Sequence, residues 1–380
     1  MFNRRQVVVG ALVLVVATFT ITAAGFLYFI HLISGDALTT MKFFRALQIV
    51  HTRYVEEVPV NTLMEGAVRG MVRSMGDPHS IYLDGKMFRE LQVETEGAFG
   101  GIGVVVGMKD NVLTVVSPIE GTPGDKAGIK SGDQILKIDG EDTKNLALDE
   151  AVAKIRGPKD TQVELTLRNA KGEVRAVILT RSTIQIKTVA GKMMRDDVGL
   201  IRIAMFNEHT AQEFAKKLGE LEAEGMKSLV LDLRDNPGGL LDQAVLVSRY
   251  LVPKGPVVSV VMKDGSKEVH SSNLEKPKYP LVVLVNQGSA SASEIVAGAV
   301  QDTQAGTLVG TKTYGKGSVQ TVIRLDSDTA IKLTIAKYLT PAGRSINGIG
   351  IEPDVNLPLA ENFDNQLLEA IERAADAQPK

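Results

Sequence analysis

The sequence predicts a layered α/β core that follows a small β-rich module and an N-terminal membrane-spanning helix. Three observations lead to this prediction. Residues 6–35 contain no Asp, Glu, Lys or Arg. Residues 92–183 alternate short β-type runs with glycine turns, and from residue 197 onward strand-like runs alternate with helical ones. Such alternation of strands and helices is typical of an α/β layer structure.

The composition narrows the classes of function. The 380 residues, 44% of them hydrophobic, are enough for two domains. The 43 basic and 45 acidic residues give a net charge of −2, so no global basic surface for nucleic acid is expected. The chain has no cysteine, which excludes a disulfide, a zinc–thiolate site and a cysteine nucleophile.

Residues 1–36 are predicted to form a signal-anchor segment. The apolar stretch exceeds the ~20 residues that span a bilayer, and it is longer than the ~7–15-residue apolar region of a cleaved signal peptide. An uncleaved anchor is therefore favoured over a cleaved signal. Arg4 and Arg5 precede the span and place the N-terminus in the cytoplasm, so the rest of the chain is expected outside it.

The chain beyond the anchor divides into four predicted regions. A helical region with a break at Pro59 is expected to serve packing and dimer contacts. It is followed by the β-rich module with one amphipathic helix at residues 146–155, and then by the core, where "SLVLDL" and "PLVVLV" suit a sheet buried on both faces. An amphipathic helix ends the chain. The predicted boundaries are 37–91, 92–183, 184–360 and 361–380.

The segment "GSASASEI", residues 288–295, lies between a predicted strand and a predicted helix. A sharp strand-to-helix turn can expose a serine hydroxyl above a sheet, and the helix N-terminus offers N–H groups to an oxyanion. Ser291 is at the apex of this turn. Ser293 is expected to cap the helix, and Ser289 to shape the turn. From this segment alone, a mere tight turn of small residues is an equally good interpretation.

A serine nucleophile needs a base. None of the five histidines lies in a recognisable triad motif. Lys316, in "TYGKGSVQT", stands between two glycines in an apolar context. Burial can depress the pKa of a lysine by several units and leave a neutral amine, and Ser–Lys pairs are a known variant of the triad. The alternative is a solvated loop lysine.

The two segments "GSASASEIVAGA" and "GTKTYGKGSVQ" together resemble the carboxyl-terminal processing peptidases, also called tail-specific proteases. The resemblance extends over about residues 38–358. It implies that Ser291 is the nucleophile and that Lys316, 25 positions later, is the general base. It also implies that Gln320 orients the lysine, a role for which an amide is suited because it adds no charge.

The segment "LDLRDNPGGLL", residues 231–241, matches the family's strand and glycine loop. The resemblance implies an oxyanion hole in which one backbone N–H comes from Ala292 and the other from Gly238 or Gly239. The sequence does not decide between the two glycines. A helix-initiating Pro-Gly-Gly turn describes the same backbone and is compatible with that function.

Residues 92–183 resemble a PDZ domain through "FGGIGVVV" and "SPIEGTPGDKAGIKSGDQILKIDG". The resemblance implies a loop that binds a peptide's terminal carboxylate and a groove beside the helix. The candidate residues for this loop and groove are Phe99, Gly100, Gly101, Ile102, Gly103 and Val152. Arg156, just after the helix, is a candidate for coupling the PDZ domain to the protease core; the alternative is a solvated cation at a helix end.

The expected protein is thus an anchored serine endopeptidase with an α/β protease core and an inserted PDZ domain. It would process or degrade extracytoplasmic proteins by recognising free, apolar C-termini, without metal or nucleotide cofactors. We expect a homodimer in the bacterial cell membrane, single-pass, with the catalytic ectodomain extracytoplasmic. The alternatives are a non-catalytic PDZ scaffold or chaperone on a protease-like core, and an acyl-transferring enzyme, against which the peptide-reading PDZ module stands.

Overall fold

The structure is a computed structural model that describes residues 4–378. The chain forms two compact units, Met1–Tyr82 and Leu83–Lys380. The strand β1 (Ile81–Leu83) lies at the boundary between them.

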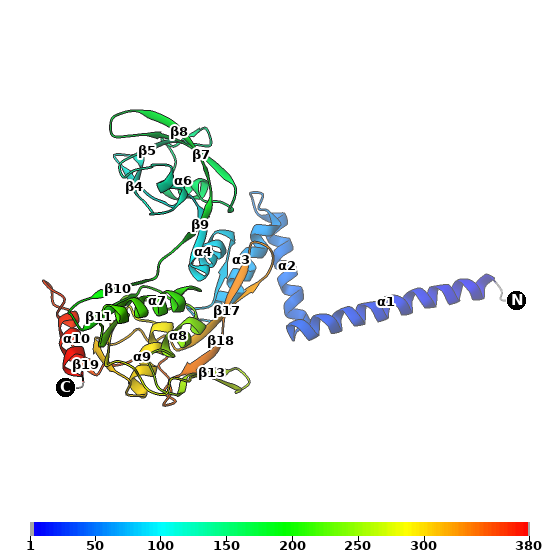
Figure 1. The fold of residues 1–380 in the computed structure, drawn as a ribbon. Helices are drawn as coiled ribbons and strands as arrows, with labels where there is room; N and C mark the ends of the chain where they lie inside the picture. The colour runs from blue at the N-terminus through cyan, green and yellow to red at the C-terminus, as the bar shows by residue number, and fades with distance from the viewer. Residues whose placement is uncertain (1–3, 379–380) are drawn as a thin grey trace. The chain divides into compact units, whose positions relative to one another are not determined.

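The first unit, drawn in blue in Figure 1, consists mainly of helices over its described residues. Within its first helix, Val8–Phe26 is apolar and long enough to cross a membrane, and none of this stretch is buried. The carboxylate of Asp36 accepts the Leu38 N–H at 2.9 Å and so starts the second helix. Pro59 precedes the third, as the predicted break requires. The helices are α1 (Arg4–Ser34), α2 (Ala37–Arg53) and α3 (Val60–Arg73).

The second unit begins with a helix and a β-rich module, in which strands and helix α6 gather together in Figure 1. Five strands form one sheet in the order β3-β4-β5-β7-β8, with β6 beside β5, while β2 pairs antiparallel with β9. Apolar side chains such as Ile135 and Leu165 fill its core. The elements are α4 (Gly85–Glu96), β2 (Ala98–Gly101), β3 (Val104–Lys109), β4 (Val112–Pro118), α5 (Pro123–Lys126), β5 (Gln134–Ile138), β6 (Glu141–Asp142), α6 (Leu148–Ile155), β7 (Gln162–Arg168), β8 (Val174–Thr180) and β9 (Ser182–Gln185).

A six-stranded sheet forms the centre of the core, in the order β10-β11-β12-β15-β16-β19. All neighbours from β11 onward pair in parallel, and β10 pairs antiparallel with β11. Every residue of β12 and β15 is buried, as the runs "SLVLDL" and "PLVVLV" predict. The strands are β10 (Val189–Met193), β11 (Val198–Ile203), β12 (Ser228–Asp232), β15 (Leu281–Val285), β16 (Thr307–Gly310) and β19 (Val355–Asn356).

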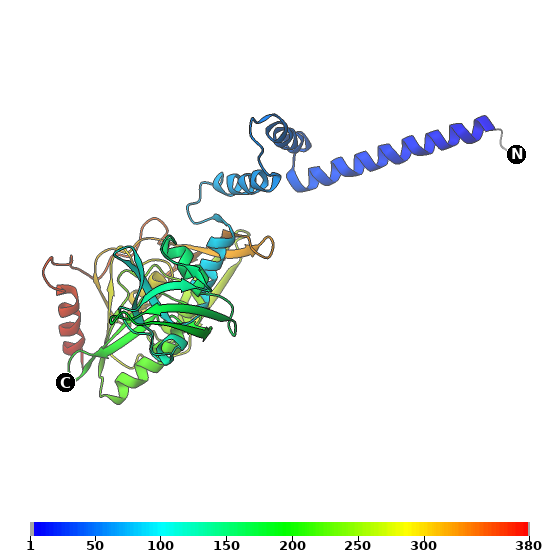
Figure 2. The same ribbon diagram turned by 90° about the horizontal axis from the view of Figure 1, so that it is seen from above.

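Helices cover both faces of this sheet. Alternate residues of β12 point to opposite sides: Leu231 packs with the helices α7 (Thr210–Ala223), α8 (Leu241–Ser248) and α9 (Ala292–Asp302). Val230 packs instead with α10 (Asn365–Asp376), drawn in red in Figures 1 and 2. The predicted α/β layered core is therefore confirmed.

A second sheet completes the core. It contains β14-β13-β18 in this order, with β17 on the other edge of β18. The apolar run "VVSVVM", residues 257–262, lies in β13 and so belongs to this sheet. The strands are β13 (Gly255–Met262), β14 (Lys267–Ser272), β17 (Ser318–Arg324) and β18 (Ala330–Leu339).

Candidate active site

The serine-rich segment forms the turn between β15 and α9. Ser291 has φ 53° and ψ −112°, in a region that residues other than glycine rarely occupy. It is also the residue immediately before the helix. The Ser289 hydroxyl donates to the Leu233 carbonyl at 2.7 Å and accepts the Asn286 N–H, so it shapes the turn.

The prediction that Ser293 caps the helix is wrong. Helix α9 starts at Ala292, which places Ser293 inside the first turn and leaves the N-cap position to Ser291. The Ser293 hydroxyl donates to the Asn236 carbonyl at 3.0 Å. It therefore ties the helix start to the glycine loop.

Lys316 lies in the irregular segment that connects β16 to β17. Its backbone N–H donates to a carboxylate oxygen of Glu294 at 2.9 Å, and the N–H of Ser291 donates to the same oxygen at 2.8 Å. Glu294 is completely buried. The structure thus links the two predicted dyad residues through one side chain that the sequence analysis did not single out.

The glycine loop lies directly against the serine turn. The Ala290 N–H donates to the Asn236 carbonyl at 3.0 Å. A Cβ atom added to Gly238 would lie 2.8 Å from the Ser291 Cβ and 2.7 Å from the Ala290 carbonyl oxygen. This position therefore accepts no side chain.

The two candidate oxyanion glycines differ in their hydrogen bonds. The Gly238 N–H donates to the Asn236 side-chain oxygen at 2.9 Å. Within residues 4–378, neither the Gly239 N–H nor the Ala292 N–H donates to another group of the chain. Gly239 lines the cavity described below, and Ala292 directly follows Ser291.

The serine turn, the glycine loop and the segment with Lys316 line one cavity of about 530 Å³. Ser291, Lys316 and Gln320 all line it, together with both glycines of the loop. The Gln320 amide donates to the hydroxyls of Ser318 at 2.9 Å and Thr334 at 3.1 Å, which fixes its position on β17. Much of the remaining wall is apolar: Met205, Phe206, Leu241, Ile295 and Val319.

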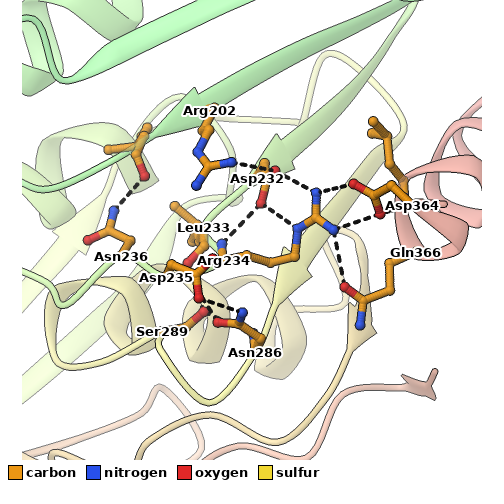
Figure 3. Close-up of polar contacts among 12 residues, drawn as sticks. Arg202, Asp232, Leu233, Arg234, Asp235, Asn236, Asn286, Ser289, Asp364 and Gln366 are labelled. Atoms are coloured by element: carbon orange, nitrogen blue, oxygen red, sulfur yellow. Dashed lines mark hydrogen bonds and ion pairs between the residues drawn. The ribbon is translucent and has the colours of Figure 1, made fainter. Parts of the chain in front are cut away.

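A buried ion-pair network supports the glycine loop from behind (Figure 3). Arg234 donates to both oxygens of Asp232 and both oxygens of Asp364, at 2.8–2.9 Å, and also contacts Gln366. Burial lowers the pKa of the Arg234 guanidinium, but the hydrogen bonds to the two carboxylates outweigh burial and raise it. The next residue, Asp235, exchanges two 2.9 Å hydrogen bonds with Asn286. The network joins α10, β12 and the serine turn.

The candidate peptide-binding residues of the β-rich module lie at residues 99–103 and, apart from these, at Val152 on α6. Phe99, Gly100 and Gly101 belong to β2, which pairs with β9, and only residues 102–103 form the connection to β3. Gly103 has φ 72°. Val152 is half-buried on α6, the helix that packs against β3.

Arg156 is not simply solvated. Its guanidinium lies 4.1 Å from the centroid of the Phe99 ring, a cation–π geometry. The contact joins the end of α6 to β2, the strand that enters the module.

Among the described residues, no group of three or more His, Asp or Glu side chains is placed to hold a metal ion.

The chain is similar to known protein families over most of its length. Three family models match: peptidase family S41 over residues 197–357, the PDZ domain over residues 90–168, and the activating protease CtpB N-terminal domain over residues 33–87.

Relatives align over most of the chain. The carboxy-terminal processing protease CtpA of Bacillus subtilis (strain 168) is 40% identical over 319 residues, which cover 83% of this chain and 68% of the relative. The carboxy-terminal-processing protease of Bartonella bacilliformis is 42% identical over 328 residues, covering 83% and 74%. Among solved structures, the photosystem II D1 C-terminal processing protease matches with 32% identity and a TM-score of 0.49, covering 87% of this chain and 95% of that one. The chain therefore belongs to the carboxy-terminal processing proteases, serine-type peptidases of family S41, and it carries a PDZ domain.

Proposed function

We propose that the protein is an endopeptidase with a Ser–Lys dyad, in which Ser291 is the nucleophile and Lys316 the general base. One observation carries the proposal: a strained serine at a strand-to-helix turn and a half-buried lysine line the same cavity. Gln320, held by two hydroxyls on the same wall, is proposed to orient the lysine amine.

The reaction would proceed through an acyl-enzyme. Neutral Lys316 accepts the hydroxyl proton as Ser291 Oγ attacks the scissile carbonyl carbon. The protonated amine then gives this proton to the leaving nitrogen, and the C–N bond breaks. Water, deprotonated by the same lysine, hydrolyses the ester and restores the serine.

We propose that the N–H groups of Ala292 and Gly239 stabilise the oxyanion. Both N–H groups lack a partner within the described chain, whereas the Gly238 N–H already donates to Asn236. Gly238 would instead serve by its small size, because it lets the loop approach Ser291. Preorganised backbone donors of this kind are worth about 10²–10³ in rate.

The dyad is tested with Ser291→Ala and Lys316→Ala, assayed on an unfolded protein with an apolar C-terminus. Each should lower kcat by at least about 10³-fold, because the residues of such a unit act together. Lys312→Ala, in the same loop but paired with Glu352, and Ser266→Ala, in an exposed turn, are the matched controls. Persistent cleavage by either dyad variant would refute the proposal, and an inactive wild type would favour the scaffold alternative.

We propose that the PDZ domain receives the free, apolar C-terminus of a protein substrate. The carboxylate of the peptide would accept hydrogen bonds from the N–H groups at residues 102–103, and the peptide would add as a strand to β3 opposite Val152.

Val152→Asp should raise KM for a substrate with such a C-terminal tail and leave cleavage of a short peptide unchanged. Ala153→Asp, one position along α6 and exposed, is the control. Equal cleavage of free and C-terminally amidated substrates would contradict this role.

Further, we propose that α1 anchors the protein as a single-pass protein of the bacterial cell membrane, with residues 37–380 on the extracytoplasmic side. The chain would have five functional divisions: the anchor at 1–36, the helical region at 37–91, the PDZ domain at 92–183, the protease core at 184–360 and the terminal helix at 361–380. A homodimer would form through the helical region. Sedimentation in detergent of the full chain and of a chain without residues 37–80 measures whether this homodimer forms.

A further inference from the structure

The buried carboxylate of Glu294 accepts four hydrogen bonds. One oxygen accepts the N–H groups of Ser291 and Lys316, as described above. The other accepts the Thr313 hydroxyl at 2.6 Å and the Gly315 N–H at 2.7 Å. The four donors come from the serine turn and from the loop before β17, so this side chain joins two segments that are separate in sequence.

The hydroxyl of Tyr338, on β18, makes the complementary contacts. Its single proton is shared between two carbonyl oxygens, that of Lys316 at 2.5 Å and that of Ser291 at 3.1 Å. The Tyr338 side chain is 1% exposed. Burial, and secondarily the charge of Glu294, raise the pKa of Tyr338 well above its usual value, so the hydroxyl keeps the proton that it donates.

The same two residues are thus held at both ends: Glu294 binds their N–H groups and Tyr338 binds their carbonyls. We propose that Glu294 and Tyr338 form a clamp that sets the distance between the Ser291 and Lys316 backbones, and that both are positioning residues for proton transfer. The proposal rests on the dyad proposed above.

The backbone of Lys316 needs such a clamp to hold its position relative to Ser291. Lys316 lies outside the strands, so no ladder of strand hydrogen bonds fixes its backbone. Proton transfer needs the lysine within hydrogen-bond reach of the hydroxyl, and a misplacement of about 1 Å can cost about 10²-fold in rate. A carboxylate suits this place because it offers two acceptor oxygens and no donor to four donor groups.

Tyr338→Phe is the primary test, because it removes only the hydroxyl and keeps the buried ring. We expect kcat per active site to fall by about tenfold or more with KM nearly unchanged, since the cavity wall is retained. Active sites are counted by titration with a fluorophosphonate that labels the activated serine, which separates a slower site from a smaller folded fraction.

Tyr279→Phe is the matched control. The Tyr279 hydroxyl donates to the Glu222 carboxylate, and neither residue lines the cavity. This variant also loses a tyrosine hydrogen bond, so it should change stability at most and leave kcat per active site at the wild-type value.

Glu294→Gln tests the other half of the clamp. Glutamine replaces one acceptor oxygen with a donor that faces N–H groups, so we expect a larger loss of kcat than in Tyr338→Phe. The double variant should lose less than the product of the two single losses, because both changes disturb one geometry.

Wild-type kcat per active site in Tyr338→Phe, or a loss explained entirely by fewer titratable sites, would overturn the clamp. Full multiplicativity in the double variant would also contradict a shared geometry. If Ser291→Ala and Lys316→Ala are inactive while Tyr338→Phe is normal, only the clamp fails. If the dyad variants cleave normally, the dyad itself fails.

Discussion

At the residue scale, the strained backbone of Ser291 depends on a neighbouring residue that has no side chain. Ser291 has a positive φ, and such strain persists only where the surrounding structure holds it. Gly238 supplies part of these surroundings, because its missing side chain leaves room for the Ser291 Cβ. Its φ of 102° also disfavours any other residue.

Gly238→Ala is therefore expected to lower both stability and activity. The added methyl group would meet backbone and the Ser291 Cβ at 2.7–2.8 Å, and the strained φ adds to the cost, together about 1–3 kcal/mol in the free energy of unfolding. The serine turn would shift, and kcat would fall by more than about tenfold. Thermal denaturation and peptidase assays measure the two effects.

The control for this variant is Gly255→Ala. Gly255 also has a positive φ, 146°, but a Cβ there would meet nothing within 4 Å. It should lose stability from backbone strain alone and retain kcat. Equal kcat losses in the two variants would show that the crowding at Ser291 is not the cause.

At the element scale, α10 is connected to the active site through one arginine. Arg234 follows β12 and holds Asp364, the residue that caps α10 by accepting the Leu367 N–H at 2.9 Å. Two positions after Arg234, the side chain of Asn236 binds the Gly238 N–H. The terminal helix thus stabilises the strand end from which the glycine loop starts.

Asp364→Asn should destabilise the protein at neutral pH more than in acid. Burial raises the pKa of Asp364, but the hydrogen bonds from Arg234 and from the Leu367 N–H, together with the nearby arginine charges, outweigh burial and lower it overall. A carboxyl with a lowered pKa stabilises the fold above its unfolded value of about 3.9, and that stability is lost as pH falls through the folded pKa. The difference in melting temperature between wild type and variant should therefore be largest above about pH 5 and shrink below pH 4.

Asp376→Asn, at the exposed end of the same helix, is the control. It should show a small and nearly constant difference over this pH range. A pH-independent deficit in Asp364→Asn would mean that the helix cap, and not the ion pair, carries the effect.

At the scale of the whole molecule, the apolar N-terminal stretch and the residues proposed for catalysis belong to different compact units. The apolar stretch Val8–Phe26 lies in the first unit, while every residue proposed for catalysis lies in the second. The second unit contains its own cores on both faces of the central sheet. Catalysis should therefore not require the anchor.

A chain without residues 1–35 is expected to remain in the aqueous phase and to keep its kcat on a short peptide, whereas the full chain should partition into detergent. Phase separation followed by assay of both fractions measures this. A soluble full-length chain would contradict the anchor, and an inactive shortened chain would show that the first unit contributes to the site.

The sequence by itself determined the architecture and pointed to the two residues that we propose as the dyad. Its apolar runs predicted the buried strands β12 and β15, because a strand covered on both faces must be apolar throughout. The short motifs around Ser291 and Lys316 are local, so the resemblance to a family could be recognised from them alone.

Only the tertiary structure decided which groups surround these residues. Glu294, Tyr338 and Arg234 act through contacts with segments 19 to 130 positions away, a separation that no local pattern encodes. The same holds for our proposal of Gly239 over Gly238, which rests on the hydrogen bond that the Gly238 N–H already makes in the folded loop. The helix cap at Ser291 instead of Ser293 was missed because helix α9 begins at Ala292, directly after the positive φ of Ser291, and the pattern of three serines does not indicate this start.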